Sequence, residues 1–138
     1  MLTQLKAFDS DLREGLAELA KHMSQPALNG DLLSRTRLKL TRLIGRRRSL
    51  IQCTILPCLH DVPPKYAAQL GELRVETVAL AVQFSTHLVR WTARAIQADW
   101  AGYQTASVEM RRSLLRRIDA DTALLYPLLT AKMGLALS

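Results

Sequence analysis

Apolar residues recur at steps of three and four along four segments of this chain, and this spacing restricts the fold to packed helices. The first segment carries the stripe Leu5, Phe8, Leu12, Leu16, Leu19 and Met23. Such a period places the apolar side chains on one face of an α-helix. The sequence therefore predicts helices over residues 3–24, 31–59 and 64–98, and a fourth from the Asp99 cap to about Lys132.

Short segments containing proline, at residues 25–30 and 60–64, separate the first three predicted helices. The residue before a proline avoids the α region, so Pro26 ends the first helix. Asp31 and Asp99 stand where an aspartate side chain can cap the helix that follows. Short connections force neighbouring helices to run antiparallel. The prediction is therefore an all-α, up-down-up-down antiparallel four-helix bundle, one domain over the 138 residues.

Charged side chains interrupt two of the predicted apolar stripes. The second helix carries the stripe Leu33, Thr36, Leu40, Leu43, Arg47, Leu50 and Thr54. In the fourth helix, Arg117 and Asp121 occupy inward positions one turn apart, where their side chains can pair. A buried charge without a partner is costly, so these side chains are expected to pair or to contact water.

The two halves of the chain, residues 3–59 and 64–132, resemble each other. One half ends in the phrase Ile55-Leu56-Pro57-Cys58-Leu59, and the other in the phrase Leu125-Tyr126-Pro127-Leu128-Leu129. An apolar pair, a proline and further apolar residues near a helix end are an uncommon combination. Its occurrence at matching places indicates that the bundle is made of two repeated helix pairs.

Through these phrases and the Ala98-Asp99-Trp100 turn, the chain resembles the hemerythrin-like, HHE cation-binding domains. The resemblance covers nearly the whole chain and is strongest over residues 73–129. It implies a four-helix bundle whose members hold two iron ions between the helices with histidines and carboxylates.

The resemblance also implies where the metal ligands would stand, namely a histidine and a carboxylate one turn later, ahead of each proline phrase. Those positions hold Arg47, Ile51, Arg117 and Asp121. Arginine is cationic at any working pH and cannot ligate a metal, so only Asp121 keeps a ligand-capable side chain. The histidines of the first and third helices would fall near Arg13 and Arg74, where no histidine stands. We therefore expect the bundle without its usual di-iron cofactor.

Two interpretations of Arg47, Arg117 and Asp121 follow. In the first, the three side chains form a structural ion pair that fills the former metal cavity. In the second, arginines around one aspartate leave net positive charge, and their guanidinium groups bind a small anion such as a carboxylate or phosphate.

Basic residues line the surfaces of two predicted helices, and the chain has a formal charge of +7. The second helix carries Arg35, Lys39, Arg42 and Arg46, and the fourth carries Arg111, Arg112 and Arg116. Either set could contact a nucleic-acid backbone, although no aromatic residues interleave with them and solvated faces are the simpler interpretation.

His87 and the two cysteines suggest further sites. The segment His87-Leu88-Val89-Arg90 resembles the phosphotransfer histidine of small four-helix signalling domains, but bulky Trp91 stands where those domains have glycine.

Cys53 and Cys58 would point in different directions around one helix, so a disulfide between them would strain the backbone. We interpret them as buried apolar residues in a reducing compartment, which predicts a cytoplasmic protein. With His60 and Asp61 they match no common zinc module.

These patterns contain no nucleophile with a convincing base, so we expect no enzyme. The leading hypothesis is a non-catalytic hemerythrin-like bundle, monomeric or homodimeric, that acts as a regulatory or protein-interaction module. The alternatives are a small-anion-binding protein, a nonspecific nucleic-acid binder, and residual metal binding. No apolar run approaches the roughly 20 residues that cross a bilayer, so no membrane partner is expected.

Overall fold

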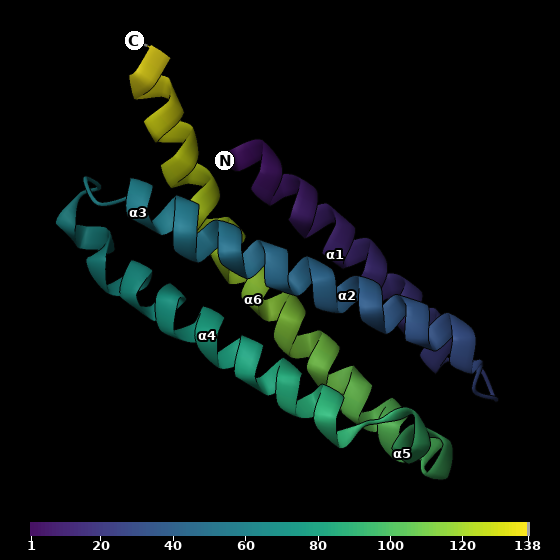
Figure 1. The fold of residues 1–138 in the computed structure, drawn as a ribbon. Helices are drawn as coiled ribbons and strands as arrows, with labels where there is room; N and C mark the ends of the chain where they lie inside the picture. Colours follow the sequence, from purple (N-terminus) through teal and green to yellow (C-terminus); the bar gives the residue numbers. More distant parts are fainter. Residues whose placement is uncertain (138) are drawn as a thin grey trace.

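The computed structural model describes the backbone of residues 1–137 and the side chains of residues 1–134, and all regular elements in this part of the chain are helices (Figure 1). The first half contains α1 (Leu2–Met23), α2 (Gly30–Leu50), the π-helical segment η1 (Ile51–Ile55) and α3 (Leu56–Cys58). The second half contains the 3-10 turn η2 (Pro64–Tyr66), α4 (Ala67–Arg90), α5 (Ala93–Ala98) and α6 (Trp100–Leu137). The all-α prediction is confirmed.

The four long helices lie alongside one another, and each runs opposite to the one before it (Figure 1). Helix α1 packs against α2 and α6, and α4 packs against the same two helices. The start of α1 and the end of α6 therefore lie at the same end of the molecule. None of the helices that the structure describes is long and apolar enough to cross a lipid bilayer.

Two apolar clusters fill the interior. The cluster nearer α5 contains Leu12, Leu40, Tyr103 and Ile118, and the cluster nearer α3 contains Leu5, Ile51, Ile55 and Leu125. Between the two clusters, each long helix contributes one buried polar residue, and these are Asp9, Arg47, Thr77 and Asp121. We call these four residues the polar layer.

The predicted stripe of the second helix is wrong beyond Arg47. The buried residues are Ile51 and Ile55, whereas Leu50 is half-buried and Thr54 is exposed. In η1 the turn is wider than an α-turn, because the Leu56 N–H bonds to the Ile51 carbonyl five residues back. A proline lacks an N–H and its ring crowds the carbonyl four residues earlier, which favours the wider turn before Pro57, although α6 stays α-helical through Pro127.

This wide turn also overturns the prediction of buried cysteines. Cys53 is exposed and Cys58 is half-buried, because the π-helical turn carries Ile51 and Ile55 to the inner face instead.

The predicted third helix is interrupted at Trp91 and Thr92. Helix α4 ends at Arg90, and the Thr92 side chain then caps α5 by accepting a hydrogen bond from the Ala95 N–H at 3.2 Å. Arg37 of α2 donates to the Trp91 carbonyl at 2.7 Å, so a side chain from another helix satisfies this carbonyl at the break. Because that contact is tertiary, the local sequence does not reveal the break.

The two predicted aspartate caps have different outcomes. Asp99 accepts a hydrogen bond from the Gly102 N–H at 2.9 Å, which confirms it as the cap of α6. Helix α2 is instead capped by Asn29, whose side chain accepts from the Leu32 N–H at 3.3 Å. Asp31 lies inside the first turn of α2, two residues after the capping position.

Candidate functional site

The polar layer holds two buried ion-paired carboxylates on either side of one arginine. Arg47 donates from Nε to Asp9 Oδ1 at 2.6 Å, and its Nη1 lies 3.1 Å from Asp121 Oδ2. Arg117 donates from Nε to the other oxygen of Asp121 at 2.7 Å. The side chains of Asp9, Arg47 and Asp121 are at most 7% exposed. The interior of the protein therefore contains a desolvated charge network contributed by α1, α2 and α6.

Tyr126 completes the network from the edge of the layer. Its hydroxyl donates to Asp9 Oδ2 at 2.6 Å, so both oxygens of this carboxylate are engaged. Burial and the hydrogen bond to Asp9 raise the pKa of Tyr126 to about 12. Burial also raises the pKa of Asp121, although the charges of Arg47 and Arg117 act in the opposite direction.

The predicted inward position of Arg47, Arg117 and Asp121 agrees with this geometry. Asp9 was not identified from the sequence as a member of the network, and neither was the role of Tyr126. Asp9 lies four residues after Leu5 and three before Leu12, both buried on α1. That spacing was a sufficient signal for an inward carboxylate. Tyr126 belongs to the second proline phrase, but its hydroxyl partner lies 117 residues away and could not be inferred locally.

Asp9 changes the charge balance on which an anion site would depend. The interior holds two arginines and two aspartates, rather than arginines around a single aspartate. The cavity beside Arg47 and Thr77 has a volume of about 20 Å³. A cavity of this size accepts a water-sized group and is too small for a phosphate. These observations favour a structural ion network over an anion pocket.

The residues present do not fit the di-iron centre that the family resemblance implies. Arg47 lies between the two carboxylates and would repel a cation, and Ile51 is fully buried in the apolar cluster. Arg13 and Arg74 lie on the surface, where Arg13 pairs with Asp119 at 2.6 Å. Among the residues that the structure describes, no three His, Cys, Asp or Glu side chains come together as metal ligands.

The predicted basic surfaces lie on separate helices. Arg35, Lys39, Arg42 and Arg46 are all exposed on α2, where Lys39 contacts Glu18 at 3.4 Å. Arg112 and Arg116 are exposed on α6, whereas Arg111 is half-buried, and burial lowers its pKa. Both helices pack mainly against α1 and α4.

His87 faces the core rather than solvent. Its ring stacks on Tyr103 with the ring centroids 5.8 Å apart, and burial together with the charge of Arg37 lowers its pKa. The loop residues His60 and Asp61 do not converge on the cysteines: the His60 ring contacts the Pro57 carbonyl, and Asp61 pairs with Lys132 at 2.9 Å.

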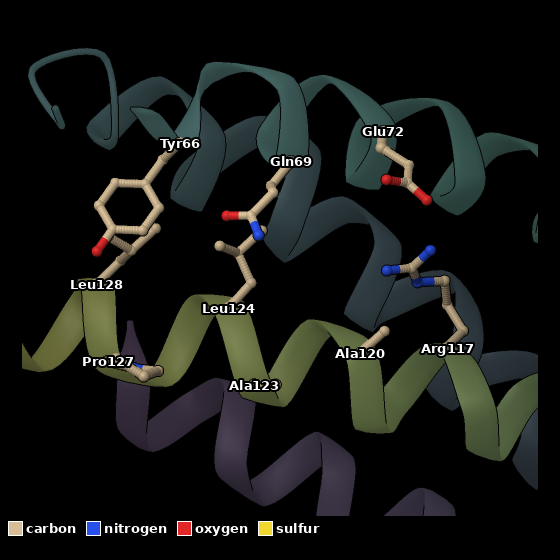
Figure 2. A pocket seen from close by; sticks show the side chains of 9 residues that line it. All are labelled: Tyr66, Gln69, Glu72, Arg117, Ala120, Ala123, Leu124, Pro127 and Leu128. Atoms are coloured by element: carbon tan, nitrogen blue, oxygen red, sulfur yellow. The ribbon is translucent and has the colours of Figure 1, made fainter. Parts of the chain in front are cut away.

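A surface groove lies between α4 and α6, and Arg117 is one of the residues that line it (Figure 2). It has a volume of about 460 Å³, and Tyr66, Gln69 and Leu124 are among its lining residues. Figure 2 shows Glu72 of α4 and Arg117 of α6 facing each other across it. Because Arg117 also holds Asp121, its side chain reaches from this groove into the buried network.

The chain has no counterpart in the comparisons made: no model of a known protein family, no curated protein and no solved structure matches it.

Proposed function

We propose that this chain is a hemerythrin-like four-helix bundle, made of two repeated helix pairs in up-down-up-down order, whose interior has replaced metal ligation by an ion network. We further propose that it is non-catalytic and acts as a protein-interaction module. The observation that carries the proposal is the position of Arg47 between the buried carboxylates of Asp9 and Asp121. A guanidinium there occupies the centre that a cation would need.

The network has a structural role in this proposal. Burying charges is favourable only when each has its partners, so a misplaced helix would leave a carboxylate or a guanidinium unpaired. The layer thereby selects one register of α1, α2 and α6 over others. The buried charges of the network are engaged with one another, so in this proposal the interaction takes place on the outer surfaces of the helices.

Iron loading tests the proposal directly. The purified full chain would be incubated with ferrous iron without oxygen, desalted, and analysed for bound metal and for its thermal unfolding midpoint. We expect iron far below one equivalent per chain and an unchanged midpoint, because Arg47 cannot ligate and repels a cation. Stoichiometric iron accompanied by a higher midpoint would overturn the proposal.

A ligand-restoring variant provides the positive control. The double substitution Arg47→His with Arg117→His replaces two cations by imidazoles beside Asp9 and Asp121. Two histidines and two carboxylates from three helices then form a plausible donor set for a divalent metal. Gain of metal by this variant would support the assigned ligand positions, and failure of the folded variant to bind metal would count against them.

A further inference from the structure

A small cavity among the residues of the apolar cluster nearer α5 is lined by positive charge. Residues of α1, α2, α4 and α6 line it, and its volume is about 20 Å³. Its polar lining residues are Arg37, His87, Tyr103, Ser107 and Arg111. None of the lining residues is an aspartate or a glutamate, and none belongs to the polar layer. The cavity is therefore separate from the ion network and differs from it in charge.

The two arginines at this cavity have no carboxylate partner. Arg37 and Arg111 are half-buried, and neither takes part in an ion pair within the described part of the chain. Arg37 donates to the Trp91 carbonyl at 2.7 Å, and Arg111 donates to the Ser107 carbonyl at 3.4 Å. Both acceptors are neutral. Two partly desolvated guanidinium groups therefore share one place without a counter-charge, which is unfavourable unless an anion joins them.

The aromatic neighbours of Arg37 do not supply the missing negative charge. Arg37 Cζ lies 5.6 Å from the centroid of the Tyr103 ring, where a cation is attracted by the ring but not neutralised. Burial raises the pKa of Tyr103, so its phenol stays protonated. Burial, together with the charge of Arg37, lowers the pKa of His87, so this ring is uncharged at neutral pH. The positive charge of the two arginines is thus uncompensated by the protein.

Two hydrogen-bond donors at the cavity have no partner within the protein. Ser107 is 1% exposed and its hydroxyl makes no hydrogen bond, and the same holds for the buried Nε of Arg37. Buried donors are nearly always satisfied, so this pair indicates a place where a small acceptor binds. A water molecule would accept from both donors but would leave the charge of the arginines unchanged. A small anion meets both requirements.

We propose that this cavity binds one chloride ion, which joins α2, α4 and α6 near the break between α4 and α5. One water molecule needs roughly 10–15 Å³, so a cavity of about 20 Å³ accepts a monatomic anion and excludes phosphate and carboxylate ligands. Ser107 and Arg37 would donate hydrogen bonds to the ion, and the charge of Arg111 would attract it. Because Arg37 also holds the Trp91 carbonyl, the ion would stabilise the packing of α2 against this break.

Thermal unfolding of the full chain in chloride tests the site. Sodium chloride would replace sodium gluconate stepwise at constant ionic strength, because gluconate is too large for the cavity. The unfolding midpoint is expected to rise by about 3–5 °C once chloride exceeds its dissociation constant tenfold. A midpoint that does not rise when chloride replaces gluconate would overturn the proposal.

Matched variants separate binding at the cavity from a general effect of salt. Arg111→Gln removes one of the two charges at the cavity, and Arg112→Gln removes the same charge from an exposed neighbour on α6. The chloride-dependent rise of the midpoint should fall at least about twofold in the first variant and stay unchanged in the second. Ser107→Ala removes only the hydroxyl and should reduce the rise without altering the charge. Equal responses of Arg111→Gln and Arg112→Gln would assign the effect to screening of the overall charge and contradict the site.

Bromide locates the ion directly. Crystals of the full chain grown in sodium bromide are expected to show an anomalous scattering peak in the cavity beside Ser107 Oγ. A water molecule at that position, without anomalous signal, would overturn the proposal. Either outcome leaves the metal-free ion network untouched, because none of its residues lines this cavity.

Discussion

At the scale of single residues, the stability of the interior depends on the contacts that Arg47 makes in the charge network. Arg47 contacts both buried carboxylates, so its removal leaves Asp9 with Tyr126 and leaves Asp121 with Arg117 only. The two carboxylates would stay buried away from water but would lose the ionic contacts with Arg47 that offset the cost of burying them. Removing one member of such a network therefore costs far more than a surface ion pair contributes.

Arg47→Leu is accordingly expected to lower the free energy of unfolding by about 3–5 kcal/mol. Chemical denaturation monitored by circular dichroism measures this change. The control is Arg46→Leu, which removes an exposed arginine from the adjacent position of α2 and is expected to change stability by less than about 0.5 kcal/mol. Equal effects of the two substitutions would show that the buried contacts do not stabilise the fold.

Tyr126 makes part of this stability dependent on alkaline pH. Its pKa is raised from 10.0 to about 12, so the folded protein retains a proton that the unfolded chain has already released. The stabilisation is therefore fully present below pH 10 and is lost as the pH rises towards 12.

The difference in unfolding free energy between the wild type and Tyr126→Phe tests this dependence. It should be constant at neutral pH and fall across the alkaline interval, and the tyrosinate absorbance of the wild type should report a matching late titration. A difference that does not vary with pH in this interval would rule out the hydrogen bond to Asp9 as its source.

At the scale of elements, the start of α2 shows that a sequence pattern can predict a helix cap correctly and still assign it to the wrong residue. Both Asn29 and Asp31 are residues that cap helices well, and they stand two positions apart. The backbone of Asn29 is extended, which is the conformation that a cap requires, while Asp31 is already helical. Asp31 then contributes only its favourable charge in the first turn.

Asn29→Ala is therefore expected to lower the unfolding free energy by about 1 kcal/mol, because the Leu32 N–H loses its acceptor. Asp31→Ala should cost less than this, about 0.3–1 kcal/mol at low ionic strength, and its effect should shrink as salt is added. Thermal or denaturant unfolding of the two variants at low and high salt distinguishes them. The reverse order of the two effects would assign the cap to Asp31.

At the scale of the whole molecule, the helices are unequally embedded. Helix α1 has eight buried residues among 22, whereas α4 has three among 24. The buried residues of α4 are Leu73, Thr77 and Phe84, whereas the same helix also carries four exposed valines, Val75, Val78, Val82 and Val89.

The sequence by itself determined the helices and much of their inner faces, because a period of three to four residues and the proline-containing turns are local properties. It also marked Arg47, Arg117 and Asp121 as inward charges, since each lies on such a stripe. Tertiary structure decided the rest. The partners of Arg47 and Tyr126, the contact of Arg37 at the α4 break and the exposure of the α4 valines all depend on which helix lies opposite. The shift of register at η1 has a local cause and a tertiary one. Pro57 is local, whereas the burial of Ile51 and Ile55 depends on the helices packed against them.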